Sequence, residues 1–322
     1  MRVRLMKLIG LLLASFTLLC GCQKQEPPTP AAGETEAIAP STAAVTATDS
    51  ADAANATYLG IYDEPVTLRD GVFEGRPFVE GGASRPRVEL VPGFTVTGDL
   101  TGDGSEQTVV LLEENSGGSG SFGYLAILAG VGTDRAGVAT ASLGDRVQIR
   151  SAVIEDQELR IQVVETGEDD AACCPSVKAL RRWTLEESRL VEGEAEIVGT
   201  LSIADLEGLE WRLEQMEGVT ELSGDSAVTL VFDAGRIAGQ SGCNRYMGAA
   251  EAGGMPGEVS FGQTAGTMMA CPDPLMQLER TYLDALGQVT RYGFRAGRLV
   301  LTSIDGAGDV GHLVFSPHPL AE

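Results

Sequence analysis

Oxygen-bearing side chains recur at alternate positions in one glycine-rich run of the sequence, residues 98–107. Asp99, Thr101, Asp103 and Ser105 each offer a side-chain oxygen, and glycines lie between them. Calcium ions bind oxygen ligands at such alternate positions, with glycine where the loop bends sharply. These four residues are therefore candidate calcium ligands.

The same run resembles the calcium loops of FG-GAP and VCBS repeats, but it carries fewer charges. Thr101 stands where those loops have Asn or Asp, and Gln107 stands where they have Asp. Because ligand charge sets calcium affinity, the resemblance implies at most a weak site, and a purely structural turn is the alternative. A single copy argues against a propeller of such repeats. We expect no other cofactor.

Composition and charge exclude several classes of protein. The chain has 322 residues, 23 Lys and Arg against 46 Asp and Glu, and a formal net charge of −23. Nucleic-acid binding needs a basic face, so no nucleic-acid partner is expected. The two histidines, His312 and His318, are too few for a histidine-rich metal site and disfavour a histidine-driven hydrolase.

Residues 1–21 have the pattern of a bacterial lipoprotein signal peptide. Basic residues precede the apolar run 8–19, which is shorter than the ~20 residues of a membrane span. The run ends in Leu-Cys-Gly-Cys, which resembles a lipobox and makes Cys22 the expected lipidation (palmitate) site. An ordinary cleaved signal or a short anchor helix is the alternative. By resemblance to Gram-negative lipoproteins, Gln23 implies the outer membrane, facing the periplasm.

Composition divides the remaining chain into a tether and two domains. Residues 22–57 are rich in Ala, Thr and Pro and lack aromatic residues, so we expect a disordered tether. From residue 58 to 200, short apolar runs alternate with turn signals, which predicts an all-β, sandwich-like domain. Residues 201–322 are expected to form a second, smaller domain. The overall fold class is therefore mainly β, with an α+β C-terminal part.

Several strands and turns of the all-β domain are predicted individually. Strands are expected at 108–112, 124–128, 138–141, 159–164 and 177–185. The pair Asp70-Gly71, between the apolar runs 66–68 and 72–73, predicts a hairpin. The run from Gly118 to Gly123 matches the dinucleotide fingerprint, but a strand rather than a helix is expected next, so we interpret the run as a loop.

The C-terminal region contains four conspicuous pieces. These are a strand beginning near Trp211, the run 242–246 (Gly-Cys-Asn-Arg-Tyr), the run 268–272 (Met-Met-Ala-Cys-Pro), and the segment 274–289. Apolar residues at spacings of three and four predict a helix over 274–289. Further strands are expected at 228–232, 236–239, 259–261, 292–294, 299–302 and 312–315.

Together these pieces resemble the META domain, the family that includes HslJ-like envelope lipoproteins, over residues 205–316. The resemblance implies a small α+β fold with a curved antiparallel sheet and one packed helix. It also implies an envelope protein linked to heat and antibiotic stress, in a family without an established catalytic activity.

Four cysteines beyond the signal segment are candidates for structural disulfides, because disulfides persist in an exported protein. A bridge between Cys243 and Cys271 would close 28 residues and stabilise the fold by about 3–4 kcal/mol. A reactive thiol, alone or paired with His312, is the alternative. Cys173 and Cys174 are adjacent, and they pair either with each other or with partners elsewhere.

Two further pairs of residues have two interpretations each. Asn244 and Arg245 are candidate binding residues, although a turn-forming Asn and a solvated Arg would explain them equally. Met268 and Met269 are expected in the core, because methionine commonly fills gaps there, and an adaptable contact surface is the alternative.

These observations predict a non-catalytic, membrane-anchored envelope lipoprotein that binds an envelope protein or supports the envelope under stress. HExxH, GxSxG and Walker motifs do not occur in the sequence. One alternative is a peptide- or lipid-binding module of the secretin-pilot or inhibitory kind. Another is a hydrolase whose carboxylates converge in space.

Overall fold

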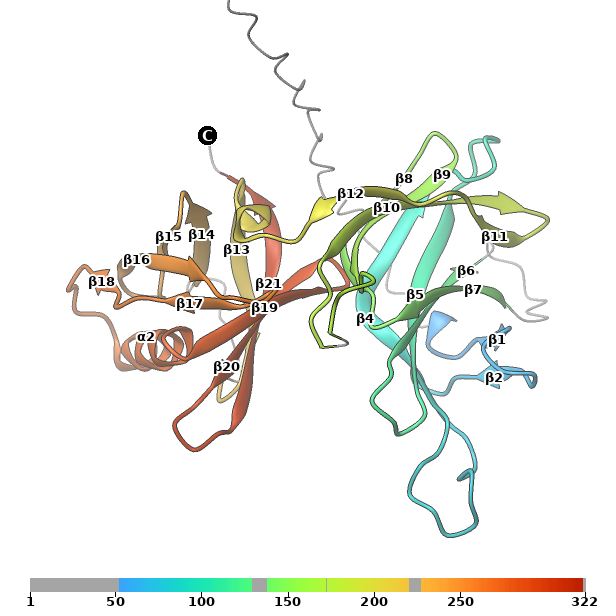
Figure 1. Cartoon of the computed structure of the whole chain (residues 1–322), viewed down its shortest axis with the longest axis horizontal. Helices are drawn as coiled ribbons and strands as arrows, with labels where there is room; N and C mark the ends of the chain where they lie inside the picture. Colours follow the sequence, from blue (N-terminus) through green and yellow to red (C-terminus); the bar gives the residue numbers. More distant parts are fainter. Residues whose placement is uncertain (1–51, 129–137, 172, 220–226, 321–322) are drawn as a thin grey trace, which may run out of the picture. The chain divides into compact units, whose positions relative to one another are not determined.

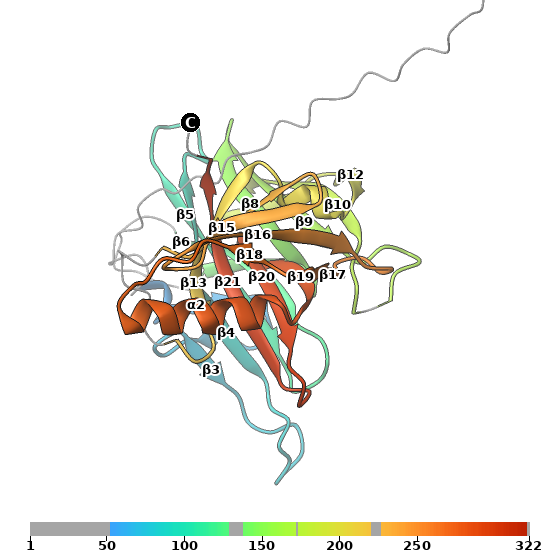
Figure 2. The ribbon, with the colours of Figure 1, turned by 90° about the vertical axis from the view of Figure 1, so that its left-hand side faces the viewer.

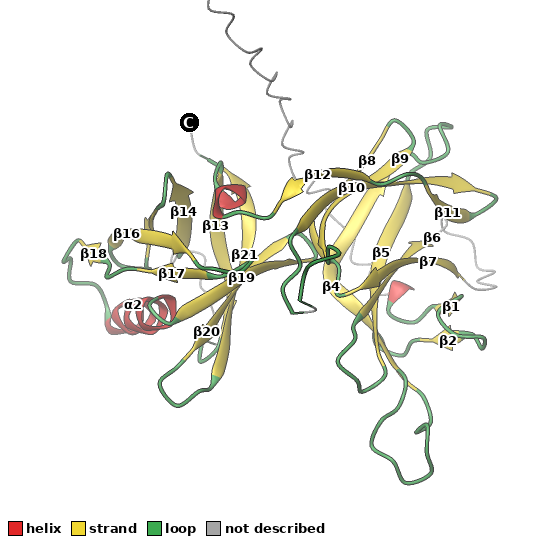
Figure 3. Cartoon of the chain, in the orientation of Figure 1, coloured by secondary structure: helices red, strands yellow, loops and turns green. Residues whose placement is uncertain are grey.

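The computed structural model describes residues 52–128, 138–171, 173–219 and 227–320. These residues belong to one compact unit, and most of them lie in β-strands (Figures 1 and 3). The expected fold class, mainly β with an α+β C-terminal part, is confirmed. The predicted signal segment and Cys22 lie outside the described residues. Among the described helices, none combines the length and apolarity needed to cross a membrane.

The first sheet has seven strands in the order β2-β1-β7-β6-β5-β4-β3. Neighbouring strands are antiparallel, except for β1 and β7, which are parallel. The strands are β1 (Thr57–Leu59), β2 (Val66–Thr67), β3 (Val72–Glu74), β4 (Arg87–Gly98), β5 (Gln107–Asn115), β6 (Phe122–Leu128) and β7 (Val138–Asp145). A short turn joins β2 to β3, the two end strands, so the sheet curves back on itself.

The hairpin predicted at residues 66–73 is wrong, although its turn is correct. Asp70 and Gly71 have φ values of 51° and 84°. Arg69 and Val72 exchange two backbone hydrogen bonds across this turn. Beyond it the strands diverge, because β2 pairs with β1 and β3 pairs with β4. The local sequence specifies the turn, whereas contacts with distant strands decide the pairing.

Both faces of the first sheet are buried, as β5 shows. Val109 and Leu111 belong to one core cluster, and Val110 and Leu112 belong to another. Successive side chains of a strand point to opposite faces, so an uninterrupted apolar run indicates a strand without a solvated side. The second cluster gathers residues from β1, β2, β4, β5 and β6 inside the curved sheet.

The folded part begins before residue 58, where the tether was expected to end. Ala53 and Ala56 are buried in the same cluster as Tyr58. The Tyr58 hydroxyl donates a hydrogen bond to the carbonyl of Ala53 over 2.8 Å. The expected tether boundary is therefore too late, because alanine composition alone does not reveal that two small side chains fit against a tyrosine.

A second sheet packs against the first. Its strands lie in the order β11-β10-β9-β8, and β12 also pairs with β10. Leu159, Ile161 and Trp183 from this sheet share one core with residues of β4 to β7. The strands are β8 (Gln148–Glu155), β9 (Glu158–Glu165), β10 (Val177–Glu186), β11 (Arg189–Glu192) and β12 (Glu196–Thr200). Two sheets around one core form the predicted sandwich-like arrangement.

The C-terminal sheet has the strand order β17-β16-β15-β14-β13-β21-β20-β19, with β18 also paired to β16. Its ends meet, because Glu258 and Arg291 form a β-bridge and the Tyr292 N–H donates to the carbonyl of Gly257 over 2.7 Å. The strands are β13 (Leu209–Met216), β14 (Thr229–Asp233), β15 (Arg236–Gln240), β16 (Arg245–Ala252), β17 (Val259–Phe261), β18 (Ala265–Gly266), β19 (Val289–Arg295), β20 (Arg298–Ile304) and β21 (Val310–Pro319).

Helix α2 (Asp273–Leu286) packs its apolar face into the core of the C-terminal sheet and lies toward the viewer in Figure 2. Leu278, Tyr282 and Leu286 are buried at spacings of four residues. The predicted helix, 274–289, extends too far, because α2 ends at Leu286 and Val289 is the first residue of β19. Val289 fits the helical spacing of the apolar residues, but it is buried as the first residue of strand β19.

Polar contacts join the C-terminal sheet to the second sheet. The Phe294 N–H donates to Gln148 Oε1 over 2.9 Å, and the Arg150 guanidinium lies 5.2 Å from the centre of the Phe294 ring. Asp205, which precedes β13, accepts a hydrogen bond from Lys178 over 2.6 Å and lies 3.6 Å from Arg150. These partly buried ion pairs and hydrogen bonds connect residues far apart in the sequence.

Candidate functional site

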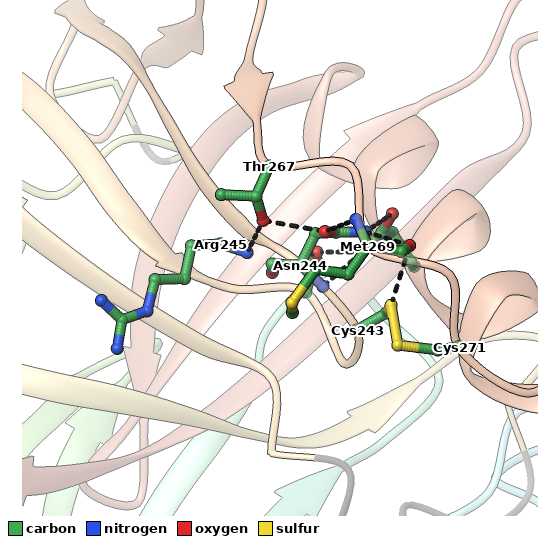
Figure 4. Close-up of a disulfide and its surroundings, with 8 residues drawn as sticks. Cys243, Asn244, Arg245, Thr267, Met269 and Cys271 are labelled. Carbon is green, nitrogen blue, oxygen red and sulfur yellow. Dashed lines mark hydrogen bonds between the residues drawn. A yellow bond between two sulfur atoms is a disulfide. The ribbon is translucent and has the colours of Figure 1, made fainter.

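Asn244, directly before β16, is 4% exposed, and both polar atoms of its side chain are hydrogen-bonded. Its Oδ1 accepts the Met269 N–H (2.7 Å) and the Thr267 hydroxyl (2.8 Å). Its Nδ2 donates to Glu279 Oε1 (3.0 Å) and to the Met269 carbonyl (3.4 Å). The side-chain amide of Asn244 therefore connects the start of β16 to the loop after β18 and to α2 by hydrogen bonds (Figure 4).

Glu279 on α2 completes this network. Its Oε2 accepts the backbone N–H of Asn244 over 2.8 Å and the hydroxyl of Ser241 over 2.7 Å. Burial acts to raise the pKa of Glu279, but the hydrogen bonds donated by Ser241 and Asn244 outweigh burial and hold it below its ordinary value. The ionised carboxylate is therefore an acceptor that anchors the loop, not a proton donor.

The lowered pKa of Glu279 predicts how stability depends on pH. A carboxyl with a lowered folded-state pKa contributes stability that is complete above its unfolded-state pKa, about 4.3, and is lost as the pH falls through the folded-state pKa. We expect Glu279→Gln to be less stable than the wild type at pH 7, with the two curves converging in acid. Urea unfolding at several pH values measures this, with Glu251→Gln on the exposed face of β16 as control. Parallel curves would contradict the assignment.

Cys243 and Cys271 form a disulfide beside this network, with their Cα atoms 6.0 Å apart and a sequence separation of 28. The predicted bridge is confirmed. The alternative of a thiol paired with His312 is wrong, because both sulfurs are bonded and the His312 ring lies 3.4 Å from the Thr302 hydroxyl instead. The disulfide fixes the loop after β18 to the start of β16.

The sulfurs of Cys173 and Cys174 also lie at disulfide distance, so these neighbours pair with each other. Cys174 is buried and Cys173 is exposed. Asp170 shapes the preceding turn, because its carboxylate accepts the N–H groups of Gly167 (2.8 Å) and Ser176 (2.7 Å). Of the two pairings left open by the sequence, the structure shows the one between neighbours.

Arg245, Met268 and Met269 point away from this network. Figure 4 shows the Arg245 side chain directed away from Asn244, and it is exposed. Met268 is 98% exposed and Met269 is 56% exposed, so their predicted place in the core is wrong. The physical reason is that the backbone of Met269 faces Asn244, while Leu278 of α2 occupies the core beneath.

The candidate calcium loop uses its carboxylates for its own hydrogen bonds. Asp99 accepts the N–H of Gly104 over 2.9 Å, and Asp103 accepts the N–H of Ser105 over 2.8 Å. The Thr101 hydroxyl contacts both carboxylates. The Ser105 hydroxyl also donates to Asp103, and together these bonds hold the pKa of Asp103 at about 2 and lower that of Asp99. The loop is a self-contained turn, and calcium binding to it stays a prediction. Across the described ranges, no three His, Cys, Asp or Glu side chains gather as a metal site.

A cavity of about 920 Å³ bears on the hydrolase alternative. Residues of β4 to β8, of β13 and of β19 to β21 line it, including three glutamates. Each of these carboxylates is ion-paired with an arginine, in the pairs Glu89–Arg87, Glu113–Arg295 and Glu214–Arg298. The hydrolase alternative stays a prediction.

The outer face of the C-terminal sheet carries an apolar row. Val231, Ala238, Met247 and Ala265 are register partners on β14, β15, β16 and β18, and we call them the outer row. Directly paired residues point to the same face of a sheet, so their side chains form a continuous stripe. Met247 is 53% exposed at the centre of the stripe.

Two arginines flank the outer row. Arg236 Nη2 lies 3.9 Å from the Met247 sulfur. Arg245 precedes Met247 by two residues on the same strand, and therefore on the same face. Within the described part of the chain, neither guanidinium makes an ion pair. The outer row thus combines apolar surface with two arginines that make no ion pair among the described residues, in a chain of net charge −23.

A closed, curved sheet with one helix in its core defines the C-terminal part as a small α+β domain. The family model of the META domain matches residues 204–315. The C-terminal third of the chain is therefore a META domain, as its sequence pieces predict.

One solved structure is similar to this chain, the NMR structure of a protein from Burkholderia xenovorans. The two are 31% identical over 35% of this chain and 83% of that chain, with a TM-score of 0.30. No curated protein matches the chain.

Proposed function

We propose that the protein is a non-catalytic, membrane-anchored envelope lipoprotein whose META domain binds a partner protein. The observation that supports this proposal is the outer row with its flanking arginines. Single exposed apolar residues are common on protein surfaces, but a contiguous row that crosses four strands is a feature of binding sites.

The anchoring part of the proposal rests on the lipobox pattern that ends at Cys22. Acylation of Cys22 would hold the chain on a membrane, and by resemblance on the outer membrane, facing the periplasm. The two cysteine pairs support this location, because structural disulfides persist in oxidising compartments. A role in the envelope stress response follows only from the resemblance to META lipoproteins.

The partner that fits the outer row is a protein segment with apolar side chains flanked by carboxylates. Its apolar groups would cover Met247, whose flexible thioether adapts to different shapes. Its carboxylates would pair with Arg236 and Arg245, because guanidinium groups bind carboxylates through paired hydrogen bonds. This complementarity would steer association as well as add affinity.

A crosslinking pull-down from native membranes tests the proposal. We expect the lipidated wild-type protein to capture a partner that also binds the purified protein, and whose crosslinked peptide contains Asp or Glu. The variant Met247→Asp should lose this partner, because it places a carboxylate in the outer row. Met255→Asp is the control, since Met255 is 46% exposed but lies outside the outer row.

Equal capture by wild type and Met247→Asp would contradict docking on the outer row. Anchoring is read separately from the same sample, by mass spectrometry of the N-terminal peptide. We expect an acylated Cys22, and an unmodified Cys22 would contradict the membrane anchor.

A further inference from the structure

We propose that Met268 and Met269 form a site of reversible oxidation, at which a peroxide converts two exposed thioethers to sulfoxides. The two residues are adjacent and are 98% and 56% exposed. Met216 on β13, by contrast, is 7% exposed and belongs to the core. Because oxidation follows access to the sulfur, the fold separates these methionines into reactive and protected ones.

Backbone contacts on either side of the pair hold the two side chains outward. On one side of Met268, the Thr267 N–H donates to the carbonyl of Arg245 over 3.0 Å. On the other side, the Met269 N–H donates to Asn244 Oδ1 over 2.7 Å, and the disulfide of Cys271 follows. The loop is thus fixed at both ends of the pair, so the sulfurs are accessible without local unfolding.

The chemistry needs one co-reactant, a hydroperoxide. The thioether sulfur attacks one peroxide oxygen, an S–O bond forms and the O–O bond breaks. The second oxygen takes up the proton released from the first and leaves as water, or as an alcohol when the hydroperoxide is organic. Sulfur loses two electrons and the peroxide gains them. A methionine sulfoxide reductase restores the thioether, because two thiols are oxidised to a disulfide and the sulfoxide oxygen leaves as water.

The fold tolerates this change because the side chains of the pair carry none of the site's hydrogen bonds. Of Met269, Asn244 contacts the backbone N–H and carbonyl and not the side chain. A sulfoxide would therefore turn the protruding surface from apolar to polar while the network of Asn244 and Glu279 remains intact. The consequence is a reversible surface modification rather than damage to the core.

Peptide mass mapping of the full-length protein during treatment with hydrogen peroxide tests the inference. From the exposed fractions, we expect the peptide with Met268 and Met269 to gain oxygen about tenfold faster than the peptide with Met216. In concentrated urea the rates per methionine should become equal, because the fold no longer protects Met216. The unfolding transition of the modified protein should match that of the untreated protein, and a reductase should remove the added oxygen.

The variant Met268→Leu/Met269→Leu provides the matched control. We expect it to fold normally and to add no oxygen in this peptide, while Met247 and Met255 react as in the wild type. Equal oxidation rates for the pair and for Met216 in the folded protein would overturn the inference. The inference would also be overturned if the cooperative unfolding transition disappeared as the sulfoxides accumulated. None of these results depends on the partner or the membrane anchor proposed above.

Discussion

Replacing Asn244 by alanine is expected to lower the free energy of unfolding by about 3 kcal/mol. The substitution leaves the Met269 N–H without its acceptor and removes one of the donors to Glu279. Buried groups that lose their partners incur the full cost of desolvation, which exceeds the value of the hydrogen bond itself. Urea unfolding at pH 7 measures the difference.

Arg245→Ala is the matched control for Asn244→Ala. Arg245 is the next residue in the chain, but its side chain is exposed and points away from the network (Figure 4). We expect its replacement to change stability by less than about 0.5 kcal/mol. If both variants lost similar amounts of unfolding free energy, the backbone turn before β16, rather than the side-chain amide of Asn244, would stabilise this part of the domain.

Removal of the Cys243–Cys271 bridge is expected to cost about 3–4 kcal/mol in the chain-entropy account of disulfides. The bridge closes 28 residues, which include β16, β17 and β18. Without it, the unfolded chain gains conformational freedom and the loop before α2 loses its covalent support. The double variant Cys243→Ala/Cys271→Ala, compared with wild type by urea unfolding without reductant, measures the loss.

The second cysteine pair offers an internal comparison. Cys173 and Cys174 are neighbours, so their bridge constrains no chain segment between them. We expect Cys173→Ala/Cys174→Ala to retain most of the stability, because loop entropy grows with loop length. If both double variants lost equal stability, the stabilisation would not arise from loop closure.

Local sequence signals predicted the strands but not all of their partners. The apolar runs of β5 and β6 were recognisable because a strand buried on both faces has few polar positions, whereas β9 and β10 mix apolar and polar residues. The predicted strands 228–232 and 236–239 do pair, and the turn between them places Ala234 and Gly235 at positive φ. The pairing of β2 with β1 was not predictable, because it depends on Tyr58 and a core built from distant strands.

Only part of the candidate site could be predicted from the sequence. Asn244 and the two cysteines stood out in short motifs, but Glu279 did not, although it binds Asn244 from 35 positions further along the chain. One signal was available, because Glu279 lies between Leu278 and Tyr282, close to the buried face of the helix. The exposure of Met268 was hidden, since sequence cannot show which way a loop turns its side chains.

The closure of the C-terminal sheet has a consequence for crowded conditions. An open sheet edge offers unpaired backbone groups to other molecules and can template aggregation. In this sheet the two ends meet at Glu258 and Arg291, and strand β18, which pairs with β16, is only two residues long. The C-terminal sheet thus gives neighbouring copies little backbone to pair with, even at high local density.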